Sequence, residues 1–218
     1  MYTTKFDIIL RRFTTLLSVV IITLFLIGAS TGILLSFYYE PGAGAAHNSL
    51  VKIDTEIGYG WLFHKAHSVA GNGMIIIGLL QIVVMFLSRQ FRKSWLVAWV
   101  SGILVTLAAI GLDWTAIILS WSQEGYWRFS IELGTIESIP FIGNQLRDIL
   151  TGGGAISSVT IQHLYTIHSY IVSIASFIFA IAHLVGVLWQ EKEMYAHIQQ
   201  TQEENLQSIE NKGAYQMR

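Results

Sequence analysis

Four long runs of apolar residues dominate the pattern along the chain. They cover Phe13–Tyr38, Ala66–Ser88, Ser94–Trp121 and Thr151–Gln190. A helix needs about 20 apolar residues to cross the hydrocarbon core of a bilayer, and each run is long enough. The second helix is expected to begin near Trp61, and the fourth near Ser157, after the glycines of TGGG. The pattern therefore predicts an all-α protein built as a four-helix transmembrane bundle.

Polar residues divide the chain into three parts. Residues 1–12 form an amphipathic start, residues 13–190 the four-helix transmembrane domain, and residues 191–218 a polar tail rich in Gln and Glu. The first apolar run is longer than the roughly 7–15 residues of a signal-peptide core, so we expect it to be retained. The tail is expected to be a short helix or disordered.

Basic residues fix an expected orientation. Lys5, Arg11 and Arg12 precede the first helix, and Arg89, Arg92 and Lys93 fill the turn between the second and third. Short loops rich in Lys and Arg stay on the cytoplasmic side, called the n side here. Both termini are therefore predicted on the n side. The connections Glu40–Gly60 and Ser122–Ile156 are predicted on the opposite p side.

Composition agrees with a membrane protein and excludes several kinds of site. Of the 218 residues, 53% are hydrophobic and 12% are charged, with a net charge of −1. That balance gives no indication of a nucleic-acid partner. The chain contains no cysteine, which excludes disulfides, iron–sulfur ligation and thioether-attached haem.

Three histidines lie deep inside the predicted membrane helices, where ionisable residues are costly and usually functional. His67 in the second helix and His168 in the fourth lie at similar depths below the p-side ends. His183 follows His168 by 183 − 168 = 15 positions, roughly 22 Å along a helix and near the same face. Two imidazoles at one depth suit ligation of a single haem. The alternative is that these histidines hydrogen-bond in helix packing.

Segments along nearly the whole chain resemble the N-terminal four-helix portion of cytochrome b, and within that family the separate cytochrome b6 subunit. They are TGILLSFYYEP (Thr31–Pro41), GWLFHKAH (Gly60–His67), WVSG (Trp99–Gly102), LSWSQEGYW (Leu119–Trp127) and IESIPFIGNQLRDILTGG (Ile136–Gly153). The histidines His168 and His183 follow in the family's order and spacing.

The resemblance implies ligands for b-type haem iron. His67 and His168 correspond to the axial ligands of the p-side haem. His183 corresponds to one ligand of the n-side haem, whose partner is expected 14 positions after His67, at Gln81. Because glutamine is not a usual haem ligand, we expect one haem b on the p side. Two haems stay possible if His183 binds with an unusual or external ligand. Otherwise His183 is a polar residue paired with Gln81.

Glycines and other positions of the family pattern are partly retained. Gly32 and Gly102 correspond to glycines that let the haem macrocycle approach. At other positions this chain differs from the family. Leu16 stands where the family has the cysteine that binds an extra haem, and Ser18 and Ala116 stand where it has glycines. His64 and His163 replace arginines that meet haem propionates, and Ser120–Ser122 replaces the PWD of the quinol site. No covalent haem is therefore expected. Asp113 is an intramembrane carboxylate, either functional or paired within the bundle.

These features predict an integral membrane b-type cytochrome subunit that carries electrons between quinone or quinol and a partner redox protein. It is expected to act within a cytochrome bc- or b6f-like complex, not as a stand-alone enzyme. The acidic loop that the family needs for quinol oxidation belongs to a C-terminal part, expected elsewhere. The rival interpretation is a haem-poor scaffold, an assembly or pigment-protein partner. A transporter is disfavoured, because no repeated broken-helix pattern is present.

The predicted orientation can be tested with topology reporters. A reporter fused after Lys93 should read cytoplasmic, because the basic turn holds that end of the helices on the n side. A reporter in the stretch Glu132–Glu137 should read external. The opposite pattern would reverse both side assignments and leave the helix count unchanged.

Overall fold

A computed structural model describes residues 5–88 and 95–216, and every regular element in these ranges is a helix. Four long apolar runs are the helices α1 (Lys5–Ser36), α3 (Gly60–Leu87), α4 (Leu96–Leu119) and the run of α7 (Ser158–Thr166), η2 (Ile167–Val172) and α8 (Ser173–Gln216). Each is long and apolar enough to cross a membrane. The predicted all-α, four-helix transmembrane fold is confirmed. The basic turn with Arg89, Arg92 and Lys93 lies outside the described residues.

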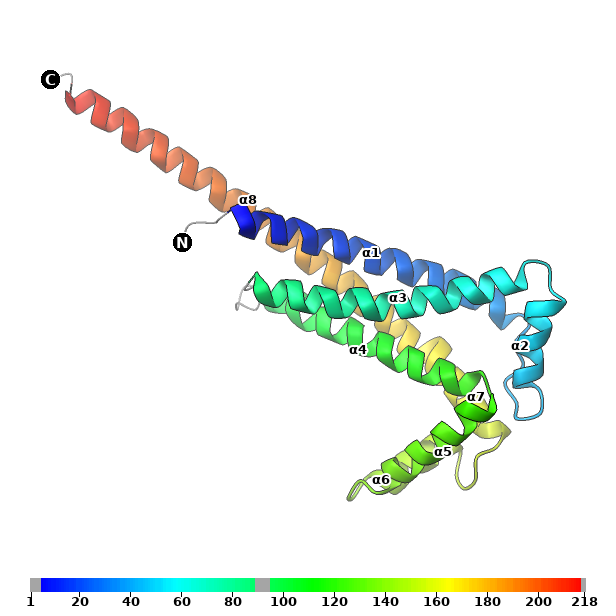
Figure 1. Cartoon of the computed structure of the whole chain (residues 1–218). Helices are drawn as coiled ribbons and strands as arrows, with labels where there is room; N and C mark the ends of the chain where they lie inside the picture. Colours follow the sequence, from blue (N-terminus) through cyan, green and yellow to red (C-terminus); the bar gives the residue numbers. More distant parts are fainter. Residues whose placement is uncertain (1–4, 89–94, 217–218) are drawn as a thin grey trace.

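The four long helices run alongside one another (Figure 1), and their contacts close a ring. Helix α1 packs against α3 and α8, and α4 packs against the same two helices. Helices α3 and α8 therefore lie diagonally across the bundle, and both run from the end with the long connections, predicted to be the p side, to the end predicted to be the n side. This arrangement lets side chains of α3 and α8 meet only along the bundle axis, where the predicted ligands lie.

An apolar cluster fills the middle of the bundle. Its buried members are Ile21, Phe25, Met74, Val105, Ala109 and Ala180. Phe25 also stacks on Phe177 with ring centroids 5.3 Å apart. Met74 lies halfway between His67 and Gln81 along α3, so this cluster separates the p-side level from the n-side level.

Both p-side connections are helical, which the sequence interpretation did not anticipate. The first contains α2 (Ala46–Thr55), and the second contains α5 (Gln123–Glu137) and α6 (Gly143–Thr151). The indole of Trp121 donates to the carbonyl of Ala43 at 2.9 Å. Trp114 on α4 donates to a Glu132 carboxylate oxygen on α5 at 2.6 Å. These bonds fasten the p-side helices to the end of the bundle.

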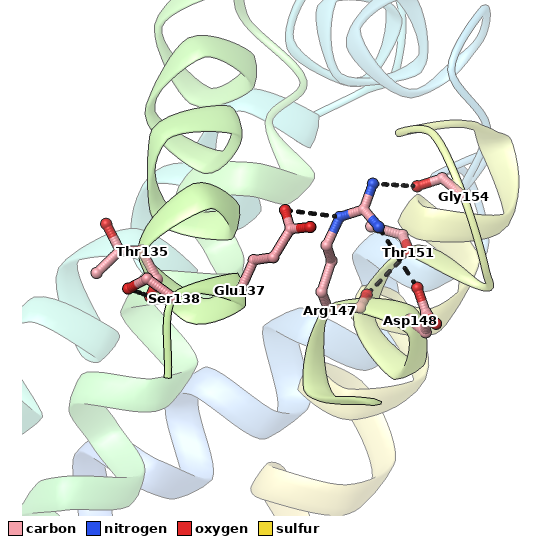
Figure 2. A network of polar contacts seen from close by, with 7 residues as sticks. All are labelled: Thr135, Glu137, Ser138, Arg147, Asp148, Thr151 and Gly154. Carbon is pink, nitrogen blue, oxygen red and sulfur yellow. Dashed lines mark hydrogen bonds and ion pairs between the residues drawn. The ribbon is translucent and has the colours of Figure 1, made fainter. Parts of the chain in front are cut away.

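Arg147 joins the α5–α6 hairpin to the loop that leads into α7 (Figure 2). Its guanidinium lies 3.5 Å from Glu137 and 3.6 Å from Asp148, and it donates to the carbonyl of Gly154 at 3.2 Å. Exposed ion pairs contribute little individually. Through these contacts, however, Arg147 connects the end of α5, helix α6 and the loop before α7.

Two helices extend further than predicted. Helix α1 begins at Lys5, so it takes in most of residues 1–12, the stretch predicted to be an amphipathic start. Helix α8 continues through the polar tail to Gln216 and projects beyond the bundle (Figure 1). Helix α1 contains no proline or glycine before Gly28, and α8 contains none between Gly186 and Gly213. The Glu, Gln and Lys residues of the tail also favour helix. At both boundaries the sequence changes from apolar to polar, but no helix-breaking residue is present, so the helix continues.

The tight turn between α5 and α6 depends on Gly143. A Cβ atom there would lie 2.4 Å from the carbonyl oxygen of Ile136 and 2.5 Å from that of Glu137, whereas Gly134 has nothing within 4 Å. Gly143→Ala should cost about 1–3 kcal/mol, because backbone must move. Gly134→Ala, the matched control, should be neutral or stabilise by up to about 1 kcal/mol. Thermal unfolding in detergent measures both; equal unfolding temperatures would contradict the assigned clash.

Candidate ligand pairs on the bundle axis

His67 and His168 meet on the axis of the bundle. Their ring centroids lie 6.1 Å apart and their planes are inclined by 53°. Two imidazoles that bind one metal ion at about 2 Å each place their centroids roughly 6 Å apart. The structure therefore brings these two predicted ligands together at a distance that fits one shared iron.

Hydrogen bonds at Nδ1 define the protonation of both rings. His67 donates from Nδ1 to the carbonyl of Gly28 on α1 at 2.8 Å. His168 Nδ1 lies 2.8 Å from the hydroxyl of Thr115 on α4, and that hydroxyl donates its own proton to the carbonyl of Gly111 at 3.0 Å. Thr115 therefore accepts from His168. Each Nε2 keeps its lone pair, as a metal-binding imidazole requires.

The sequence interpretation missed two features of this level. One is the set of hydroxyl and carbonyl partners, including Thr31, whose Oγ1 lies 3.3 Å from His67 Nδ1. A hydroxyl residue at the depth of a predicted ligand was the available signal. The other is the π-helical turn η2, which contains His168. Single π turns inside α-helices are common at functional sites.

Gly32 and Gly102 contact the histidine rings directly. A Cβ atom at Gly32 would lie 2.9 Å from Cε1 of His67, and one at Gly102 would lie 2.9 Å from Cε1 of His183. Both glycines thus leave room beside a predicted ligand. Their assignment to haem binding stays a prediction.

The n-side level contains His183 and Gln81, each only 1% exposed. His183 donates from Nδ1 to the carbonyl of Ala98 on α4 at 2.9 Å. Its Nε2 faces the side-chain amide nitrogen of Gln81, which also donates to the hydroxyl of Ser18 at 2.7 Å. His183 and Gln81 are thus paired across the bundle, as one reading of the sequence had it.

This n-side level does not fit a second bis-imidazole site. The lone pair of His183 Nε2 is taken up by the Gln81 amide, and the Ser18 hydroxyl lies 3.1 Å from the same nitrogen. The carbonyl oxygen of Gln81 is buried without a hydrogen-bond partner. Within the described part of the chain, no three His, Asp or Glu side chains converge on one point, so each level offers at most a ligand pair.

The remaining candidates lie near the p-side surface. His64 pairs with Asp54 at 2.9 Å, and His163 donates to the carbonyl of Ile149 at 2.8 Å. Asp113 lies close enough to Arg128 on α5 to help raise the pKa of that guanidinium, although the bond from Arg128 to Glu132 is the larger cause. The charge of Asp113 therefore acts on an arginine of α5, and its role inside the bundle stays a prediction.

Comparison with known proteins gives a consistent result. The family model described as Cytochrome b/b6/petB matches residues 7–191. Cytochrome b6 of Cyanidium caldarium is 30% identical over 166 residues, 76% of this chain and 77% of that protein. Cytochrome b6 of Auxenochlorella protothecoides is 30% identical over 165 residues, with the same coverage.

A solved structure shares the fold. A chain from the structure entitled "Hyperthermophilic respiratory Complex III" superposes with a TM-score of 0.71 at 23% identity. The match covers 80% of this chain but 47% of the solved one. The present chain thus spans about half the length of that structural relative.

Proposed function

This chain belongs to the cytochrome b/b6 family, and from that premise we propose that it is a membrane electron carrier holding one b-type haem on the p side. His67 and His168 would hold the haem iron through their Nε2 atoms. The observation that supports this most directly is the pair of imidazoles 6.1 Å apart, with both Nδ1 atoms hydrogen-bonded and both Nε2 atoms left as lone-pair donors.

Haem b, when bound, supplies reversible one-electron chemistry at its iron. The residues of this chain orient the ligands and exclude water. The Gly28 carbonyl and the Thr115 hydroxyl hold the two rings and strengthen them as ligands, an arrangement that typically contributes 10–100-fold in metal affinity. Gly32 keeps the space beside His67 open.

The n-side level carries no haem in this proposal. Gln81 stands where a second imidazole is required, and its amide occupies the lone pair of His183. One haem near the p side does not span the bilayer. The chain then acts as a one-sided relay, passing electrons between quinone or quinol and a partner redox protein on the p side.

The partners proposed are other subunits of a cytochrome bc- or b6f-like complex. Support comes from the relatives named cytochrome b6 and from the fold shared with part of a longer chain of a respiratory complex III. Trp121 is retained within the altered quinol-site sequence Ser120–Ser122 and is fixed by its bond to Ala43.

Replacing either proposed ligand tests the site. His67→Ala or His168→Ala should abolish the bound haem, because each ring supplies one of two axial bonds. Haem per polypeptide, measured by the pyridine haemochrome assay on purified protein, gives the result. His197→Ala, an exposed histidine on the projecting part of α8, is the control and should leave haem content unchanged. Unchanged haem content in both ligand variants would contradict the assignment of His67 and His168 as haem ligands.

Restoring an imidazole at position 81 tests the n-side level. We expect one haem b in the natural protein and partial occupancy of a second in Ser18→Gly/Gln81→His. Gln81→His replaces the amide that faces His183 with an imidazole. Ser18→Gly removes the hydroxyl that lies 3.1 Å from Nε2 of His183. Ser18→Gly alone, the control, should retain one haem. Two haems in the unmodified protein would instead show that His183 already ligates iron.

A further inference from the structure

The two diagonal helices have different spacings between the same two levels. On α3, Gln81 follows His67 by 81 − 67 = 14 positions, and along α7, η2 and α8, His183 follows His168 by 15. Fourteen residues make about 3.9 turns of α-helix and fifteen make about 4.2 turns, a difference of about 100°. Because α3 and α8 run in the same direction, a regular fourth helix would place His183 about 100° further round from His168 than Gln81 lies from His67.

The structure nevertheless satisfies both levels. His168 lies 6.1 Å from His67, centroid to centroid, and bonds to Thr115. His183 pairs with Gln81 and bonds to Ala98. The extra residue of the fourth helix must therefore be absorbed between the two levels without rotating either histidine.

The π turn η2, Ile167–Val172, lies where that residue has to be absorbed. A π turn closes its hydrogen bonds over five residues instead of four, so it accommodates one additional residue in the turn. Tyr170 and Ile171 within it are 57% and 61% exposed, so the wide turn adds side chains on the outer surface and leaves the axis clear.

We infer that η2 is a one-residue insertion that positions His168 against His67 while His183 stays level with Gln81. It is a positioning segment for the proposed p-side ligand pair, and in that respect the inference rests on the proposed function. Removing one residue from η2 should leave both levels in register, because the spacing then equals the 14 positions of α3. Adding one residue should disrupt the register.

Two changes of equal size and opposite sign test the inference in the full chain. Deletion of Ile171 should preserve haem content and the low-spin haem signal in electron paramagnetic resonance, because both rings keep their positions. Insertion of one alanine after Ile171 should lose both. Equal loss in the two variants, including failure of the deletion variant to fold, would overturn the inference, since an ordinary α-helix suffers equally from either change.

A second measurement is independent of haem. The chain has no cysteine of its own, and Ala98 and Val187 lie in one buried cluster at the n-side end. Oxidative cross-linking of Ala98→Cys/Val187→Cys should persist with the deletion and fail with the insertion, because a disulfide tolerates little separation. If the unmodified protein binds no haem, the proposed function fails, but this cross-link still tests the register of the two helices. Loss of the cross-link in the deletion variant would contradict the inference about η2.

Discussion

The three histidines on the bundle axis, His67, His168 and His183, are each anchored by a hydrogen bond from Nδ1 to a neighbouring helix, and the arrangement of the axis depends on these three bonds. His67 donates to α1, whereas His168 and His183 donate to α4. A polar group in hydrocarbon is costly without a partner, so the bonds satisfy one side of each ring. They also leave Nε2 as the atom available toward the diagonal partner.

The two levels share this anchoring and differ in what Nε2 meets. On the p side it is a second imidazole, and on the n side it is the amide of Gln81. A single residue type therefore separates a potential ligand pair from a closed polar contact. The n-side contact is imperfect, because the carbonyl oxygen of Gln81 is buried without a partner, at a cost of about 1–3 kcal/mol. The bundle tolerates that cost beside an apolar middle cluster.

The end of the bundle that carries α2, α5 and α6, predicted to be the p side, is fastened by several side-chain hydrogen bonds. Tyr39, beyond the end of α1, donates to the carbonyl of Leu119 at 2.8 Å, and burial raises the pKa of its phenol. Together with the bonds of Trp114 and Trp121, it fixes the connecting helices over the level of His67 and His168. The level assigned to electron transfer is thus the one shielded by additional structure.

Hydrophobic patterning alone determined the four membrane helices, because length and apolarity suffice to specify a membrane span. The sequence also identified His67, His168, His183 and Gln81, since polar residues inside apolar runs are conspicuous. It did not reveal helices α2, α5 and α6, which are short and of mixed composition and so lack the long apolar run that marks a membrane span. Nor did it locate the ends of α1 and α8, where polarity changes but the helix does not break. The π turn was decided by tertiary structure: only the demand that α8 meet α3 at two levels makes one extra residue require a wider turn.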